Sequence, residues 1–192
     1  MSKRSPIKRS RQPADERVVQ LGDGRRLTTI AEAKAMAHPL RLRILRMCSM
    51  QELTNKQLAD KLDRDPGTVL YHVRQLTDVG LLETTAVRTG ESGALEKPYR
   101  ATDHLRLLES TPALSVPGGA LAPIQAFQEE LAEAGPESVE KMSRMVLHLS
   151  PDEAEALATR LVAIFDEYAA SDHERLDRPA HGGIFVLHRL AE

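Results

Sequence analysis

The sequence predicts a mainly α-helical fold with one β-hairpin, followed by a small α+β region at the C-terminal end. Three observations lead to this prediction. Helix-length segments with clear capping signals fill the first part of the chain, an alternating segment that turns at glycines comes next, and a stretch rich in proline and glycine separates these from the rest. With 192 residues, of which 41% are hydrophobic, the chain can bury one core or two small ones.

Composition excludes several classes of protein. The single cysteine, Cys48, rules out an intramolecular disulfide framework and indicates a reducing compartment. No apolar run approaches the roughly 18 residues that a membrane-spanning helix needs, and the first residues are charged without the apolar stretch of a secretory signal. We therefore expect a cytoplasmic protein without a membrane partner.

The formal net charge of −2 conceals an uneven distribution. Residues 1–106 contain 20 lysines and arginines against 13 aspartates and glutamates, whereas residues 107–192 contain 6 against 15. A basic half favours a polyanionic partner such as nucleic acid, and an acidic half is repelled by one. The alternative interpretation is that charge segregates by chance on two solvated surfaces.

Composition also divides the chain into four parts. Residues 1–26 form a basic, serine-containing segment that we expect to be a flexible arm. Residues 27–108 contain the capped helices and the hairpin. Residues 109–123 are rich in proline and glycine, which is typical of a linker. Residues 124–192 form the C-terminal α+β region, for which we expect a role in dimerisation or effector binding.

Three short helices are expected before the hairpin. The first covers residues 29–37. The second covers residues 38–50, with Pro39 in its first turn and apolar residues on two sides, which predicts a central core helix. The third begins at a capping box formed by Thr54 and Gln57 and then turns its leucines inward.

A fourth helix is predicted over residues 66–79. Asp65 is a good N-cap, Pro66 suits the first helical position, and Gly80 suits the position that ends a helix. Its apolar residues form one buried stripe, while the opposite side is first small, then apolar or aromatic, then cationic. A solvated helix would carry Glu and Lys there. The outward residues are Gly67, Leu70, Tyr71, Arg74 and Asp78, with Thr68 on the shoulder.

The third and fourth helices, joined by residues 63–65, match a helix-turn-helix, whose second helix enters the DNA major groove. In that setting Thr68 can bond a phosphate or a base edge, and Arg74 can reach guanine or phosphate. Leu70 and Tyr71 can contact thymine methyl groups or sugar carbons. The alternative is that this face contacts another protein, with Arg74 as a charge at the rim.

A β-hairpin follows the fourth helix directly. Residues 81–88 alternate as a strand, a glycine-containing loop comes next, and residues 97–102 return as the second strand. A hairpin in this position is a wing. The predicted fold of this part is therefore a winged helix-turn-helix.

The segments AHPLRLRIL, LTNKQLADKLDRDPGTVLYHVRQLTDVGLLE and KPYRAT together resemble the winged helix-turn-helix of the arsenical-resistance repressor (ArsR) family, in particular metal-free members with an added C-terminal region. The resemblance implies a homodimeric transcriptional regulator, a repressor, that sets one recognition helix of each subunit in successive major grooves of an inverted repeat. It also implies which residues contact double-stranded DNA. By match to the family pattern, these are Pro66, Gly67, Thr68, Leu70, Tyr71 and Arg74, with Arg88, Lys97 and Arg100 in the wing. Thr54 and Gln57, at the start of the third helix, are also expected to contact DNA.

The sequence departs from the metal-sensing members of that family. It has neither a Cys-x-Cys motif near the third helix nor an Asp/His pair of suitable spacing on a terminal helix, so that no metal or other cofactor is expected. Cys48 lies on the buried stripe of its helix and is interpreted as a core residue. His72, beside the buried stripe of the fourth helix, is interpreted as a structural histidine.

Two other functional classes compete with a DNA-binding regulator. An enzyme is not expected, because motifs typical of nucleotide-binding proteins, hydrolases and zinc peptidases are missing. A winged helix used only for protein–protein interaction is the alternative function, although it leaves the basic arm and the wing cations unexplained. A small-molecule effector is not excluded as a further partner.

Helices and strands are expected to alternate in the C-terminal region. An amphipathic helix over residues 123–135 comes first, and a short helix over residues 137–143 runs into a strand over residues 144–150. A long helix over residues 151–170 opens with a capping box, and residues 182–190 close the chain as a strand. Such a layer can hold a dimer together or bind an effector. The expected inward residues are Ile124, Phe127 and Leu131 in the first helix and Ala154, Leu157, Leu161, Ile164 and Tyr168 in the long one.

Overall fold

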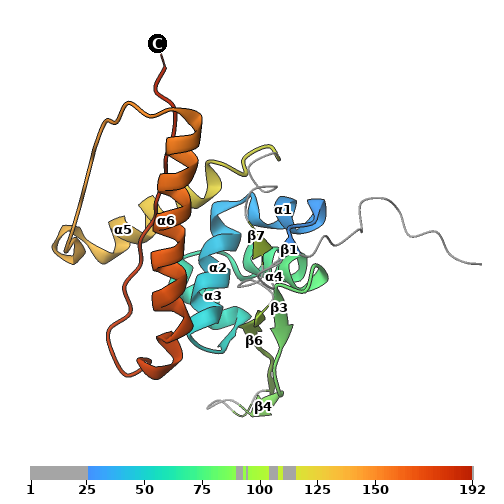
Figure 1. The fold of residues 1–192 in the computed structure, drawn as a ribbon. Helices are drawn as coiled ribbons and strands as arrows, with labels where there is room; N and C mark the ends of the chain where they lie inside the picture. Colours follow the sequence, from blue (N-terminus) through green and yellow to red (C-terminus); the bar gives the residue numbers. More distant parts are fainter. Residues whose placement is uncertain (1–25, 90–92, 94, 104–107, 110–115, 192) are drawn as a thin grey trace, which may run out of the picture. The chain divides into compact units, whose positions relative to one another are not determined.

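The computed structural model describes residues 26–89, 93, 95–103, 108–109 and 116–191 (Figure 1). The expected basic arm therefore lies almost wholly outside the described residues. The chain divides into two compact units, the first ending at Glu130 and the second beginning at Leu131. This division lies inside a helix, beyond the proline-rich stretch in which composition places the linker.

The first helix, α1 (Ile30–Met36), forms where the sequence predicts it and starts at a capping box. The Thr29 hydroxyl accepts the Glu32 N–H, and Glu32 Oε2 accepts the Thr29 N–H at 2.8 Å. The same carboxylate receives Nη1 of Arg26 at 2.9 Å in a buried ion pair. Burial by itself raises the pKa of Glu32, but the hydrogen bonds from Arg26 and Thr29 outweigh burial and lower it. This pair ties strand β1 (Arg26–Leu27) to α1.

The second helix, α2 (Pro39–Met50), is the central core helix that its two apolar sides predict. His38 is its N-cap, and the ring nitrogen Nδ1 accepts the Leu40 N–H at 3.2 Å. The thiol of Cys48 is fully buried, and this burial raises its pKa to about 12. The prediction that Cys48 is a core residue is confirmed.

The helix-turn-helix consists of α3 (Asn55–Leu62) and α4 (Pro66–Asp78). The chain leaves α3 through Asp63, whose φ of 49° is left-handed. The amide of Asn55 donates to the Pro66 carbonyl at 2.9 Å, so that the start of α3 holds the start of α4. The chain leaves α4 at Gly80, whose φ of 74° is one that glycine adopts without strain.

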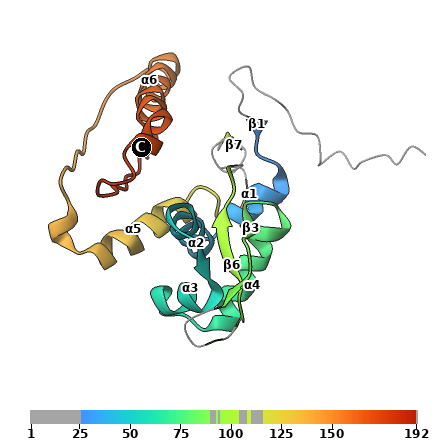
Figure 2. The ribbon, with the colours of Figure 1, turned by 90° about the horizontal axis from the view of Figure 1, so that it is seen from below.

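The predicted hairpin is present and forms part of a three-stranded antiparallel sheet. Strand β3 (Leu82–Thr84) pairs with β6 (Pro98–Ala101), and β2 (Leu53–Thr54) pairs with the other side of β6. Strands β4 (Arg88–Thr89) and β5 (Leu95–Glu96) continue the hairpin outward. Figure 2 shows α2, α3 and α4 grouped around β3 and β6. The fold is a winged helix-turn-helix.

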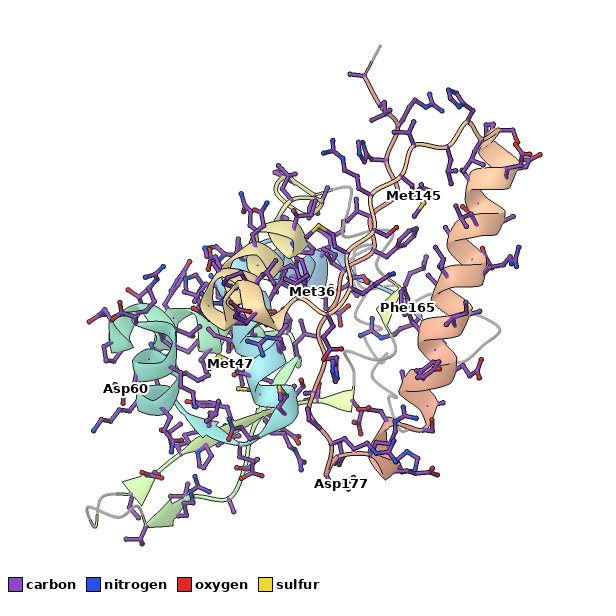
Figure 3. All side chains as sticks on the ribbon, turned by 90° about the vertical axis from the view of Figure 1, so that its left-hand side faces the viewer. Met36, Met47, Asp60, Met145, Phe165 and Asp177 are labelled. Atoms are coloured by element: carbon purple, nitrogen blue, oxygen red, sulfur yellow. The ribbon has the colours of Figure 1, made fainter. Side chains whose placement is uncertain are left out.

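One hydrophobic core joins these elements. It takes residues from α2, α3 and α4 and from the strands, and Met36 and Met47 pack against it at its edge (Figure 3). Both faces of α2 and one face of α4 contribute to this core. The core therefore packs against α4 from Val69 to Leu76. Its largest fully buried side chains include Ile44, Leu45, Leu58, Val69, Val73, Leu76, Leu81 and Leu82.

Two features of the first unit differ from the prediction. Strand β7 (Leu108–Glu109) pairs in parallel with β1, although composition places residue 109 in a linker. Helix α5 (Ala122–Ala134) forms, but it buries two alanines, while the bulkier residues expected inward are only partly covered. Small side chains let α5 approach its neighbours, and ion pairs support it from α2. These pairs are Arg43 Nη1 with Glu129 Oε2 at 2.7 Å and Arg46 Nε with Glu130 Oε1 at 2.5 Å.

The second unit contains the long helix α6 (Pro151–Ala170), which starts at the predicted capping box of Ser150 and Glu153. The predictions of a short helix and of two strands in this unit are wrong. The short helix is reduced to one 3-10 turn at Pro136–Ser138, and the segments expected as strands, residues 144–150 and 182–190, are not strands. A strand needs a neighbour for its backbone hydrogen bonds, and neither segment has one in the described part of the chain.

No helix among the described residues is both long and apolar enough to cross a membrane.

Candidate nucleic-acid interface

The first turn of α4 is fixed by its N-cap. Asp65 Oδ1 accepts the N–H groups of Gly67 at 2.9 Å and of Thr68 at 3.0 Å. A Cβ atom on Gly67 would lie 3.0 Å from that same oxygen, so that glycine leaves room for the cap. Sequence reasoning assigned Gly67 only to DNA contact and missed this role. Pro66, Gly67 and Thr68 are all exposed in this turn.

The outward face of α4 is exposed as the helical periodicity predicts. Thr68, Tyr71 and Arg74 are exposed, Tyr71 with 59% of its surface accessible, and Leu70 is half-buried. Arg74 has no hydrogen bond or ion pair with another described residue. The helix therefore presents one hydroxyl, one phenol and one guanidinium on the side opposite to the core. Its buried residues are Val69, His72, Val73 and Leu76.

A buried guanidinium holds α4 from behind. Nη1 of Arg41, on α2, donates to Gln75 Oε1 at 2.7 Å and lies 3.5 Å from His72 Nδ1. Its Nη2 donates to the Lys34 carbonyl at 2.8 Å, and its Nε donates to the Ala35 carbonyl. One side chain thus connects the end of α1, the start of α2 and the middle of α4, which fixes the direction in which the outward face points.

His72 is a structural histidine, as predicted. It is 7% exposed, and its ring centroid lies 4.5 Å from that of His38. Burial, together with the neighbouring charges of His38 and Arg41, lowers the pKa of His72 to about 4. At neutral pH the ring is uncharged and can accept a hydrogen bond from Arg41.

The wing arginines are exposed but already paired with carboxylates. Arg88 Nε lies 3.4 Å from Glu96 Oε2 across β4 and β5, and Arg100 Nη2 lies 2.7 Å from Glu83 Oε1 across β3 and β6. In each case the two residues face each other directly in the antiparallel register. Sequence reasoning missed both carboxylates, because cross-strand pairs can be read only once the register of the hairpin is known.

The other predicted site residues occupy two different settings. Lys97 is exposed, and its Nζ lies 6.0 Å from the ring centroid of Tyr99. The side chains of Thr54 and Gln57 form the predicted capping box, in which Thr54 Oγ1 accepts the Gln57 N–H at 3.2 Å and Gln57 Oε1 accepts the Thr54 N–H at 2.9 Å. Thr54 is buried, so its role in the structure is to start α3.

Within the described residues, no three His, Cys, Asp or Glu side chains gather in a group that could hold a metal ion. Two histidines of the first unit serve the fold, His38 as a helix cap and His72 in the core. The outward surface of α4 and the wing presents hydrogen-bond donors, an aromatic ring and cations, which suit a binding face.

Fold and surface together define a winged helix-turn-helix protein. A family model described as a helix-turn-helix domain matches residues 36–85, from the end of α1 to the residue after β3. The match covers about a quarter of the chain and includes the whole of α4. No curated protein matches the sequence.

Several solved structures are similar to this chain. Reduced HlyU from Vibrio cholerae is 22% identical, with a TM-score of 0.33, and the match covers 52% of this chain and 85% of HlyU. The transcriptional repressor BigR from Xylella fastidiosa is 17% identical, with a TM-score of 0.32, covering 57% of this chain and 84% of BigR. ZitR from Lactococcus lactis, in complex with DNA, is 18% identical, with a TM-score of 0.31, covering 68% and 74%. At these values the similarities carry no functional conclusion.

Proposed function

We propose that the protein is a sequence-specific, DNA-binding transcriptional regulator of the ArsR type. In this proposal it acts as a repressor in the cytoplasm and binds an inverted-repeat operator as a homodimer, with α4 of each copy in a major groove. The observation that carries the proposal is the face of α4 on which Thr68, Tyr71 and Arg74 are exposed while the opposite face is locked into the core.

The chemistry of this face suits a groove. At the N-terminal end of α4, small residues and a hydroxyl allow close approach to the sugar-phosphate backbone. Tyr71 offers an apolar ring for thymine methyl groups or sugar carbons together with a phenol that donates or accepts. Arg74 is one turn of helix further on from Leu70, and its guanidinium can bond both acceptors of a guanine edge. Because Arg41 and the core fix α4, these side chains would meet DNA without reorganising the helix.

Lysines and arginines outside α4 extend the proposed contact with DNA. Arg88, Lys97 and Arg100 lie in the wing, where they can follow the adjacent backbone. The sequence of residues 1–26 adds further lysines and arginines, for which we propose sequence-independent contacts with phosphates. Thr54 and Gln57 stand at the start of α3, the helix that crosses the backbone in this docking geometry. The homodimer is supported by the resemblance of residues 28–104 to ArsR proteins.

Salt dependence of duplex binding tests the proposal. Binding of the full-length protein to a random-sequence DNA duplex and to duplexes selected from a random pool would be measured by fluorescence anisotropy across a salt series. We expect the association constant to fall by roughly 10³-fold or more between about 50 and 200 mM salt, because bound phosphates release counterions. A selected duplex should bind about 10³-fold more tightly than the random one.

A protein-interaction module is the second candidate, and one observation favours it. The carboxylates of Glu83 and Glu96 already occupy the wing arginines, which reduces the positive potential available to DNA. On this alternative, the exposed Tyr71 is the centre of a protein interface and Arg74 lies at its rim. Duplex binding that is absent, or that is insensitive to salt and sequence, would favour this second function.

A further inference from the structure

The second unit lacks a core of its own. None of the described residues from Leu131 to Ala191 is buried, although α6 is a 20-residue helix with a well-formed cap. Its apolar positions repeat at helical spacing, yet Ile164 is 50% exposed and Phe165 is 55% exposed. A helix with this pattern is stable in a folded protein only when its apolar stripe is covered.

The second unit exposes many apolar side chains. Summed over α6 and both extended segments, they present on the order of 1,000 Å², which is comparable with the roughly 800 Å² that each partner contributes to a stable interface. They come from α6 and from both extended segments, as Met145 and Phe165 illustrate (Figure 3). They include Met142, Met145, Val146, Leu147, Val162, Ile164, Phe165, Tyr168, Phe185, Val186 and Leu187.

The two extended segments have the character of unpaired strands. Residues 144–149 and 183–190 are mostly apolar apart from one arginine and one histidine each, and both contain the order Val-Leu-His, at residues 146–148 and 186–188. They flank α6 on its two sides in the chain. Their backbone groups have no ladder partner among the described residues. Such a row of donors and acceptors pairs readily with another strand.

We propose that a second copy of this chain covers this surface. Segments 144–149 and 183–190 of the two copies pair into one sheet, and the apolar stripe of each α6 packs onto it. The inference rests on the homodimer of the proposed function and names the part of the chain that forms it.

The number of elements favours a second copy as the occupant. One chain supplies two strand-length segments and one long helix, and a two-stranded ribbon is marginally stable at best. Two chains supply four strands and two helices, which is an ordinary sheet size covered by one layer of helices. In a two-fold arrangement the same surface of each copy forms the interface, so every apolar contact is made twice.

Charge argues against a polyanion at this surface. Residues 131–191 contain 11 aspartates and glutamates against 6 lysines and arginines, so that DNA and anionic lipid headgroups are both repelled. The dimer surface and the proposed DNA-binding face of α4 are then on separate units of the chain, and each can be tested without the other.

A pair of substitutions on α6 tests the proposal in the full-length chain. Ile164→Asp places a carboxylate in the apolar stripe, whereas Thr159→Asp places the same group about 140° away around the helix. Both positions are exposed, so neither change removes a buried contact within the chain. Sedimentation equilibrium should show a dimer for the wild type and for Thr159→Asp, and a dissociation constant raised at least about tenfold for Ile164→Asp.

Amide hydrogen exchange supplies the second measurement. In the wild-type dimer, residues 144–149 and 183–190 should be protected, and Ile164→Asp should remove that protection while α4 keeps its own. A wild-type chain that stays monomeric, a dimer that Ile164→Asp does not weaken, or segments that are protected in a monomer would each overturn the proposal. A stable dimer without duplex binding would instead refute the proposed function and leave this inference standing.

Discussion

Glu83 and Arg100 face each other across strands β3 and β6, with Arg100 Nη2 donating to Glu83 Oε1 at 2.7 Å. Arg100 was expected to contact DNA, yet in this structure a carboxylate holds it. The pair is exposed on both sides. Exposed ion pairs are weak, so that a phosphate can displace Glu83 from the guanidinium. The carboxylate then acts as a competitor that lowers the affinity of the wing for any duplex.

Replacing Glu83 by glutamine should therefore strengthen DNA binding. We expect Glu83→Gln to raise affinity for a random duplex about two- to fivefold and to steepen the salt dependence, because one more cation meets a phosphate. Asp60→Asn on the exposed side of α3 removes the same charge without an ion pair in the described structure, and serves as the control. Equal gains in both variants would mean that only net charge matters.

Truncating the outward face of α4 should weaken operator binding without unfolding the protein. Tyr71→Ala and Arg74→Ala are each expected to cost about 1–3 kcal/mol of binding free energy on a duplex selected by the wild type. Neither side chain contributes to the core, so the melting temperature should hardly change. Lys61→Ala, which removes an exposed cation from α3, is the matched control. Normal affinity in a folded Tyr71→Ala variant would contradict the docking of α4.

Most of the first unit could be predicted because its signals are local. Thr29 and Thr54 each begin a helix through a capping box that spans four residues, and Ser150 does the same in the second unit. Asp65 caps α4, and Pro66 occupies its first turn. These contacts lie within one turn of the chain, so sequence alone determines them. The exposed face of α4 follows from helical periodicity.

Long-range contacts could not be predicted in this way. Arg41 meets Gln75 across 34 residues of sequence, and Glu83 meets Arg100 across 17, and neither spacing carries a periodic signal. The short parallel pair of β1 and β7 joins two-residue segments whose composition does not distinguish them from loops. The strands expected over residues 144–150 and 182–190 failed for a different reason: strand formation depends on a partner that a single described chain does not contain.

The Asp65 cap of α4 should contribute to the free energy of unfolding, which can be measured without DNA. Asp65→Ala removes the acceptor of the Gly67 and Thr68 N–H groups and should lower the free energy of unfolding by about 0.5–2 kcal/mol. Asp65→Asn keeps an oxygen in the same place and should retain most of that stability. Urea unfolding followed by circular dichroism measures both variants. If the two substitutions destabilise the protein equally, charge near the helix N-terminus is responsible and the cap is not.

The buried His72 predicts that the protein loses stability in mildly acidic solution. Its pKa in the folded protein is about 4, below the usual value of 6.5, because burial and the neighbouring His38 and Arg41 disfavour the charged ring. Between these two pH values the unfolded chain binds a proton that the folded chain does not, so acid favours unfolding. Stability that is complete above about pH 6.5 should fall progressively toward pH 4.

Substitution of His72 should weaken the dependence of stability on pH. In His72→Gln the amide can still accept from Arg41 but cannot titrate, so its melting temperature should change less between pH 7 and pH 5 than that of the wild type. Part of the slope should remain, since burial also lowers the pKa of His38. His173→Gln, at an exposed position of the second unit, is the control and should behave as the wild type does. A wild-type slope that His72→Gln leaves unchanged would place the acid-sensitive group elsewhere.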